Sequence, residues 1–98
     1  MSGANVAEGR LRAVMEAWML PIDPGCKQHL AQLIRQAALR IDSEGFASDP
    51  TKLWEAETNL RKLLTEMTRQ AGALGFNELH EPTFFNALSQ LCPLWPFC

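Results

Sequence analysis

The sequence predicts an all-α fold, either a four-helix bundle or an irregular array of antiparallel helical hairpins, with a non-helical C-terminal tail rich in proline and aromatic residues. Two observations lead to this prediction. Apolar residues recur at intervals of three and four over long segments, which is the pattern of helices that bury one face. Acidic-Pro pairs and Gly-Phe pairs stand between these segments, and they are typical of helix starts and helix ends, respectively. No segment alternates apolar and polar residues as a half-buried strand does.

The first predicted helix covers residues 5–20. Asn5 is its expected N-cap, and Glu8, three residues later, completes a capping-box pattern. Pro21 is expected to end the helix, because the residue before a proline disfavours the helical conformation. The apolar face of this helix consists of Ala7, Leu11, Val14, Met15 and Trp18.

The second and third predicted helices cover residues 24–43 and 50–74. Each follows an aspartate, Asp23 or Asp49, and starts with a proline, whose missing N–H is not needed in the first turn. Each ends near a Gly-Phe pair, because glycine readily adopts the left-handed conformation of a helix C-cap. Their predicted core positions are Cys26, Leu30, Leu33, Ile34, Ala37, Ile41, Leu53, Ala56, Leu60, Leu63, Leu64, Met67, Ala71 and Leu74.

The fourth predicted helix covers residues 82–92 and leaves residues 93–98 as the tail. It begins at Glu81-Pro82 and ends before Pro93. Its apolar face consists of Phe84, Leu88, Leu91 and Cys92, with Phe85 beside it. Short connections favour antiparallel neighbours, so residues 1–98 are expected to form one helical domain.

The charge and the cysteine content restrict the expected partners and location. A formal net charge of −2, with no Lys or Arg after Arg69, gives no reason to expect nucleic acid or an anionic membrane as a partner. The N-terminal residues lack the pattern of a signal peptide, and no apolar run approaches the roughly 18 residues of a membrane span. Three cysteines do not suggest a secreted disulfide framework. We therefore expect a cytoplasmic protein with reduced thiols.

The tail is the most unusual stretch, because Cys92 and Cys98 bracket two prolines and two aromatic residues. If Leu94, Trp95 and Phe97 were exposed to water, they would form an apolar patch that favours association with other molecules. They are therefore expected either to fold back on the chain's own bundle or to dock into a partner or a second copy. The two cysteines are also a candidate redox pair, or the ends of a modified peptide cut from a folded leader.

Trp54 is the other candidate for partner binding. It lies about 120° from the centre of the apolar stripe of its helix, and tryptophan is enriched at interface hot spots. The alternative is that this long helix is central and touches neighbours on two sides. Together with Leu94, Trp95 and Phe97, it completes the set of predicted partner-binding residues.

Metal and catalytic sites are not expected. Cys26 and His29, with His80 or a tail cysteine, do not have the spacing of a recognised zinc motif, and a core role for Cys26 is favoured. Glu78, His80 and Glu81 are close in sequence but lie at a helix entry, where acidic residues favour the positive end of the helix dipole. No known catalytic motif is present. The sequence thus predicts no catalytic residue, metal or cofactor.

The function predicted from the sequence is that of a small helical protein–protein interaction module: an adaptor, an assembly subunit or an inhibitor of the immunity-protein type. Its partner would be another protein or a second copy of itself, bound through exposed aromatic residues. The alternative is a thiol-dependent regulatory protein or a modified precursor that uses Cys92 and Cys98.

Overall fold

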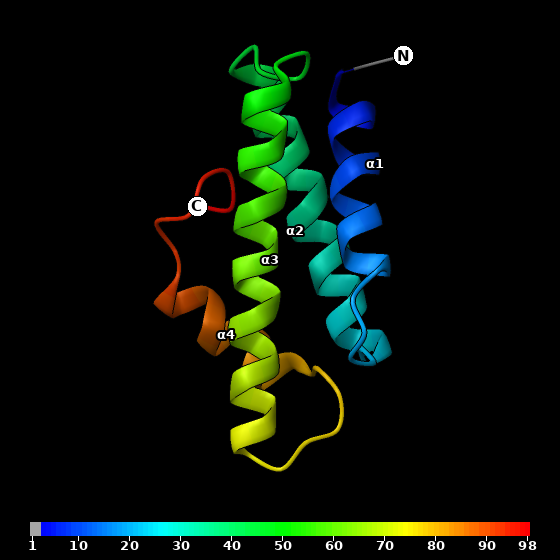
Figure 1. Cartoon of the computed structure of the whole chain (residues 1–98), viewed down its shortest axis with the longest axis vertical. Helices are drawn as coiled ribbons and strands as arrows, with labels where there is room; N and C mark the ends of the chain where they lie inside the picture. The colour runs from blue at the N-terminus through cyan, green and yellow to red at the C-terminus, as the bar shows by residue number, and fades with distance from the viewer. Residues whose placement is uncertain (1–2) are drawn as a thin grey trace.

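Three long helices and one short helix build the fold of the computed structural model, which describes residues 3–98. The helices are α1 (Gly3–Glu16), α2 (Pro24–Ser43), α3 (Pro50–Ala73) and α4 (Glu81–Gln90). The three long helices lie side by side and alternate in direction (Figure 1). Residues 3–98 contain no strand beyond a single isolated bridge. The predicted all-α, bundle-like fold is confirmed.

The α1 helix and the α4 helix occupy opposite sides of the bundle, and each packs against both α2 and α3. At 1.5 Å per residue, the 24 residues of α3 span about 36 Å, whereas the 10 residues of α4 span only about 15 Å. A helix this short covers less than half of its side of the bundle. Residues 91–98 fold along the part that α4 leaves open (Figure 1).

The core consists mainly of the predicted apolar stripes. Nearly every predicted core position of α1, α2 and α3 is buried or packed against the buried cluster. Leu74 is an exception and is exposed, because α3 ends at Ala73 and Leu74 is already its C-cap residue. None of the four helices of residues 3–98 combines the length and the apolar character needed to cross a bilayer.

The predicted caps of α2 and α3 are confirmed. The Asp23 carboxylate accepts a hydrogen bond from the backbone N–H of Cys26 at 2.6 Å, and Asp49 caps α3 in the same way. At the other ends, Gly45 and Gly75 have φ angles of +78° and +80°, the left-handed region that glycine enters without strain. These local signals set the lengths of both helices.

The predicted start of the first helix is wrong. Helix α1 begins at Gly3, so Asn5 lies inside the helix and does not cap it. Instead, the Nη1 atom of Arg35 on α2 donates to Asn5 at 3.3 Å and to Glu8 at 2.8 Å. Asn5 and Glu8, which were predicted to form a capping box, therefore connect α1 to α2 through Arg35.

The predicted end of the first helix at residue 20 is also wrong, since α1 ends at Glu16. Ile22 pairs with Leu79 in an isolated parallel bridge. In this bridge the Leu79 N–H donates to the Pro21 carbonyl at 2.8 Å, and the Asp23 N–H donates to the Leu79 carbonyl at 2.9 Å. This long-range pairing requires an extended backbone at residues 21–23, and residues 17–20 form the turn and bend that lead from α1 into it.

Helix α4 differs slightly from its prediction. It begins at Glu81 with His80 as its N-cap, one residue earlier than expected, and it ends at Gln90 instead of residue 92. Thr83 is buried and donates its hydroxyl to the His80 carbonyl at 2.8 Å. Because the helix stops early, Cys92 lies in the tail and is exposed instead of facing the core.

Candidate functional site

The C-terminal tail is closed by a disulfide between Cys92 and Cys98, whose Cα atoms are 5.3 Å apart. This pairing differs from the reduced thiols expected from the sequence, and it joins the two residues of the candidate redox pair. We call residues 92–98 the tail ring. Both cysteines are exposed, so the disulfide is accessible from solvent.

The tail ring packs against the chain's own bundle. Phe97 is only 6% exposed and belongs to the core cluster, and Pro96 beside it is buried. Leu94 and Trp95 are half-buried and pack against the same cluster. From α3, the side-chain amide of Asn59 donates to the Trp95 carbonyl. The residues predicted to reach a partner from the tail thus contact their own α2 and α3.

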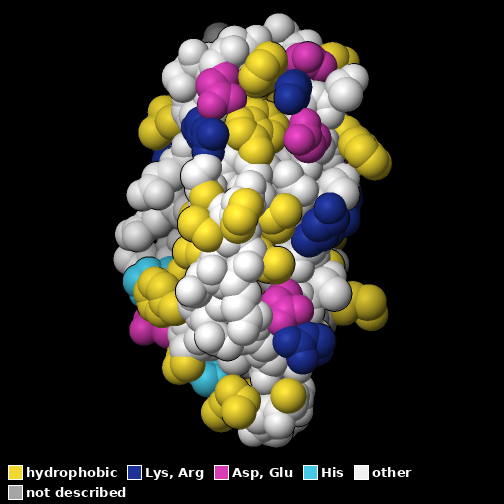
Figure 2. All heavy atoms as spheres, turned by 90° about the vertical axis from the view of Figure 1, so that its left-hand side faces the viewer, with side chains coloured by type: hydrophobic (Ala, Val, Ile, Leu, Met, Phe, Trp, Pro, Cys, Tyr) yellow, Lys and Arg dark blue, Asp and Glu magenta, His cyan; other side chains and the backbone are white. Residues whose placement is uncertain are grey.

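The Trp95 ring has polar partners as well as apolar ones. Its Nε1 donates to the Glu44 carboxylate at 2.8 Å, and its ring packs against Phe46 at an interplanar angle of 78° with the centroids 5.9 Å apart. The Lys52 ammonium lies 5.3 Å from the Trp95 ring centroid. Hydrogen bonds from Arg40, and then from Trp95, lower the pKa of Glu44. Acidic and basic side chains surround apolar ones near the top of this face (Figure 2).

Trp54, in contrast to Trp95, lies mostly in solvent. Its side chain is 61% exposed on α3, so it is not wedged between neighbouring helices. It lies three residues before Glu57 and seven before Arg61, and these spacings place the three residues on one face of the helix. That face borders α1.

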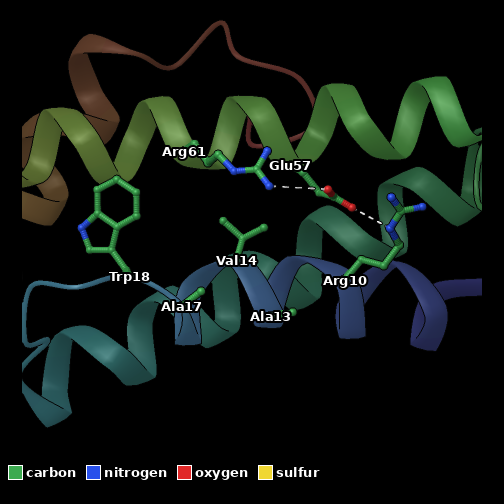
Figure 3. A pocket seen from close by; sticks show the side chains of 7 residues that line it. All are labelled: Arg10, Ala13, Val14, Ala17, Trp18, Glu57 and Arg61. Atoms are coloured by element: carbon green, nitrogen blue, oxygen red, sulfur yellow. Dashed lines mark hydrogen bonds and ion pairs between the residues drawn. The ribbon is translucent and has the colours of Figure 1, made fainter.

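A groove between α1 and α3 is a feature that the sequence analysis missed. It has a volume of about 480 Å³ and opens to solvent between the two helices (Figure 3). The residues that line it are Arg10, Ala13, Val14, Ala17, Trp18, Glu57 and Arg61. A second hollow of about 470 Å³, lined by Ala17, Trp18, Met19, Leu20 and Thr68, shares two residues with the first. We call the two hollows together the α1–α3 groove.

One end of the α1–α3 groove is apolar. The Trp18 indole reaches from the end of α1 to α3, where its Nε1 donates to Thr68 Oγ1 at 3.0 Å. Met19 follows and is 96% exposed, the largest exposed fraction among the large apolar side chains of residues 3–98. The bend after Glu16 puts Trp18 across the groove, whereas the sequence predicted it to lie on the core face of a longer helix.

The other end of the groove is charged. Glu57 lies between two guanidinium groups: Arg10 Nε is 2.5 Å from Glu57 Oε1, and Arg61 Nη2 is 3.8 Å from Glu57 Oε2 (Figure 3). The Glu57 side chain is 13% exposed, whereas those of Arg10 and Arg61 are 42% and 50% exposed. Two cations and one anion leave an excess of one positive charge, and the exposed parts of both guanidiniums are open to further acceptors.

The histidines and Cys26 lie apart from this groove. His29 Nε2 is 3.2 Å from Glu81 Oε1, and the His29 ring contacts two phenylalanines of α4. Cys26 is buried, and this burial, with Asp23 and Glu81 nearby, raises the pKa of its thiol to about 12. No group of three His, Cys, Asp or Glu side chains within residues 3–98 is arranged to hold a metal ion.

The α1–α3 groove offers apolar contacts and ion pairs, and the tail ring offers a disulfide. No known protein family, curated protein or solved structure matches this chain. The function is therefore inferred from the geometry and the charge of residues 3–98.

Proposed function

We propose that this protein is a protein–protein interaction module, in the role of an adaptor, an assembly subunit or an inhibitor, and that the α1–α3 groove is its binding surface. The observation that supports this proposal is the exposure of Met19 in the groove, and of Trp54 on the same face of α3 outside its lining, while the aromatic residues of the tail are covered by the chain itself.

The energetics of burial favour a protein as the ligand. Fully burying an exposed Met side chain contributes about 1.5–3 kcal/mol, and tryptophan is enriched among the residues that dominate binding energy. Arg10 and Arg61 add directional donors at the edge of the apolar surface. Apolar anchors beside a polar rim are the usual composition of a protein interface.

Photo-crosslinking tests this proposal. A photoreactive amino acid is placed at Ala13, inside the groove, or at Ala73, an exposed position outside its lining, and the full chain is expressed in its native cells. We expect one discrete crosslinked protein from position 13 and none from position 73. That protein, purified, should bind the unmodified chain in solution.

A matched pair of substitutions provides the control. Ala13→Arg fills the groove, whereas Ala73→Arg makes the same chemical change outside it. The reconstituted complex should lose at least tenfold in affinity with Ala13→Arg, a loss of about 1.4 kcal/mol, and should tolerate Ala73→Arg. Equal crosslinking from both positions, or equal effects of both substitutions, would contradict the proposal.

A second candidate function, thiol-dependent regulation, is favoured by the disulfide between Cys92 and Cys98. Two thiols of a reductant such as glutathione supply two electrons and two protons, which convert the disulfide into two cysteine thiols and leave one reductant disulfide. Reduction would open the tail ring and release the constraint on Phe97. The precursor alternative is weaker, because Pro96 and Phe97 are buried and a modifying enzyme would not reach them.

Intact mass after rapid alkylation of cell extract tests this second candidate. A reversible redox pair predicts that Cys92 and Cys98 are alkylated in reducing extract and protected in oxidising extract. Cys26 is the internal control: burial raises the pKa of its thiol to about 12, so it should stay unmodified in the folded protein in both. Free thiols at positions 92 and 98 under both conditions would rule out the redox function.

A further inference from the structure

We infer that the ligand of the α1–α3 groove is an amphipathic helix of another protein that carries acidic residues at one end and apolar residues along the rest of the contact. This inference rests on the proposed function, since it names the partner of the same groove. It follows from the length of the groove, the small residues on its α1 side and its uneven charge.

The length of the groove fits a helix of about three to four turns. On α3 it extends from Glu57 to Thr68, eleven residues apart, which is about 16 Å along the axis. Trp54 does not line the groove but lies three residues before Glu57, so a ligand that also reaches Trp54 spans about 21 Å. A ligand helix of about 11–14 residues spans the same distance.

The α1 side of the groove permits a helix to approach closely. Ala13 and Ala17 are four residues apart, and both are exposed in the lining. Packed helices have their axes 8–10 Å apart, and the distance depends on the size of the side chains between them. Because Ala13 and Ala17 are small, a ligand helix can lie close to α1. Val14 lies between them and is buried, so the floor beneath the ligand is apolar.

The charge of the groove selects an acidic ligand and sets its direction. Within residues 3–98, Arg10 and Arg61 pair with one carboxylate, that of Glu57, and both guanidinium side chains are partly exposed. A guanidinium has five N–H donors in a planar fork that suits carboxylates. At the opposite end, Trp18 and Met19 offer only apolar surface beyond the indole N–H, which Thr68 already accepts. The acidic end of the ligand therefore lies at the arginines.

Two synthetic peptides of about 14 residues test this inference against the full chain. They share the same leucines at helical spacing, and two positions in the first turn are glutamate in one peptide and lysine in the other. Fluorescence anisotropy of a labelled peptide gives each Kd. We expect the acidic peptide to bind about tenfold more tightly at low ionic strength, and this preference should shrink at about 0.15 M salt.

A matched pair of variants locates the preference. Arg61→Gln should weaken binding of the acidic peptide about threefold to fivefold, as expected for one partly exposed ion pair. Lys62→Gln removes the same charge from the next residue of α3, which lies outside the lining, and should change the Kd less than twofold. Both substitutions leave the Arg10–Glu57 pair in place.

Three results would overturn the inference: equal Kd values for the two peptides, no binding of either peptide, or equal effects of Arg61→Gln and Lys62→Gln. Crosslinking from Ala13 shows whether the acidic-helix ligand alone is wrong or whether the groove does not bind a protein at all. A partner crosslinked through an extended or basic segment overturns the acidic helix alone. The absence of a crosslinked partner overturns the binding function itself.

Discussion

The aromatic residues of the tail ring and Trp54 lie on opposite sides of the bundle and differ in how far the chain covers them, while Phe85 of α4 is itself 51% exposed. On the side of α4, Trp95 and Phe97 are covered because the tail ring folds against α2 and α3. On the side of α1, Trp54 and Met19 remain in solvent beside the α1–α3 groove. Both sides contain large apolar residues next to charged ones.

The difference between the sides shows that the type of residue does not decide which aromatic is available to a partner. An aromatic residue is available to a partner when no other segment of the chain packs over it. Helix α4 is too short for its side of the bundle, and the tail ring completes that side. No described segment covers the α1–α3 groove in the same way. Substitutions on the two sides should therefore affect different properties: stability on one side and binding on the other.

The largest expected effect is on the covered side. Phe97→Ala removes a buried aromatic ring and should lower the free energy of unfolding by about 3–5 kcal/mol, because it leaves a cavity against the core. Urea denaturation followed by circular dichroism measures this loss. A loss below about 1 kcal/mol would mean that the tail ring is not part of the folded core and would remove the contrast between the two sides.

The next effect concerns the covalent closure of the tail ring. The double variant Cys92→Ser and Cys98→Ser should be about 2 kcal/mol less stable than the oxidised protein, because the unfolded chain is no longer constrained by a short loop. Reductant should destabilise the unsubstituted protein by a similar amount. The double variant serves as the control, since its denaturation curve should not respond to reductant.

A smaller effect is expected at the edge of the covered side and depends on pH. Hydrogen bonds from Arg40 and Trp95 lower the pKa of Glu44 in the folded protein, so its ionised form stabilises the fold. This stabilisation is fully present above the usual pKa of about 4.5 and is lost as the pH falls through the lowered value. The stability difference between the protein and Glu44→Gln should therefore be larger at neutral pH than in acid.

The matched control for Glu44→Gln is Glu66→Gln. Hydrogen bonds from Arg69 and then Gln70 lower the pKa of Glu66 to about 2, so the same loss of stability in acid is expected. Glu66 does not contact Trp95, and only Glu44→Gln should shift the Trp95 fluorescence. Identical fluorescence changes in the two variants would contradict the assigned contact between Trp95 and Glu44.

The smallest effect on stability is expected on the open side. Trp54→Ala should change the free energy of unfolding by less than about 0.5 kcal/mol, because the side chain is mostly in solvent. The same substitution should weaken the reconstituted complex by at least tenfold, the behaviour of an interface anchor. Denaturation and binding measured on one preparation test both statements. A loss of stability as large as that of Phe97→Ala would place Trp54 in the core instead.

Local sequence signals predicted most of the fold. Asp23 and Asp49 cap α2 and α3 as expected, because a side-chain oxygen at the N-cap satisfies backbone donors in the next turn. The apolar stripes are buried because helical spacing fixes which residues share a face. Asn5 carries a similar cap signal and fails, because α1 begins at Gly3 and Asn5 lies inside it, where its side-chain oxygen accepts a hydrogen bond from Arg35 of α2. Trp18 packs against the core cluster as expected, but it also lines a groove that the stripe pattern does not describe.

The sequence by itself determined that four helices form, the caps of α2 and α3 and most of the buried faces, because each depends on residues within a few positions of one another. Only the tertiary structure decided that Leu94, Trp95 and Phe97 pack on their own bundle and that Trp54 stays exposed. The same holds for the α1–α3 groove, whose walls come from two helices that are far apart in the sequence. Periodicity assigns a residue to a face of its own helix, whereas the position and length of the other elements decide what covers that face.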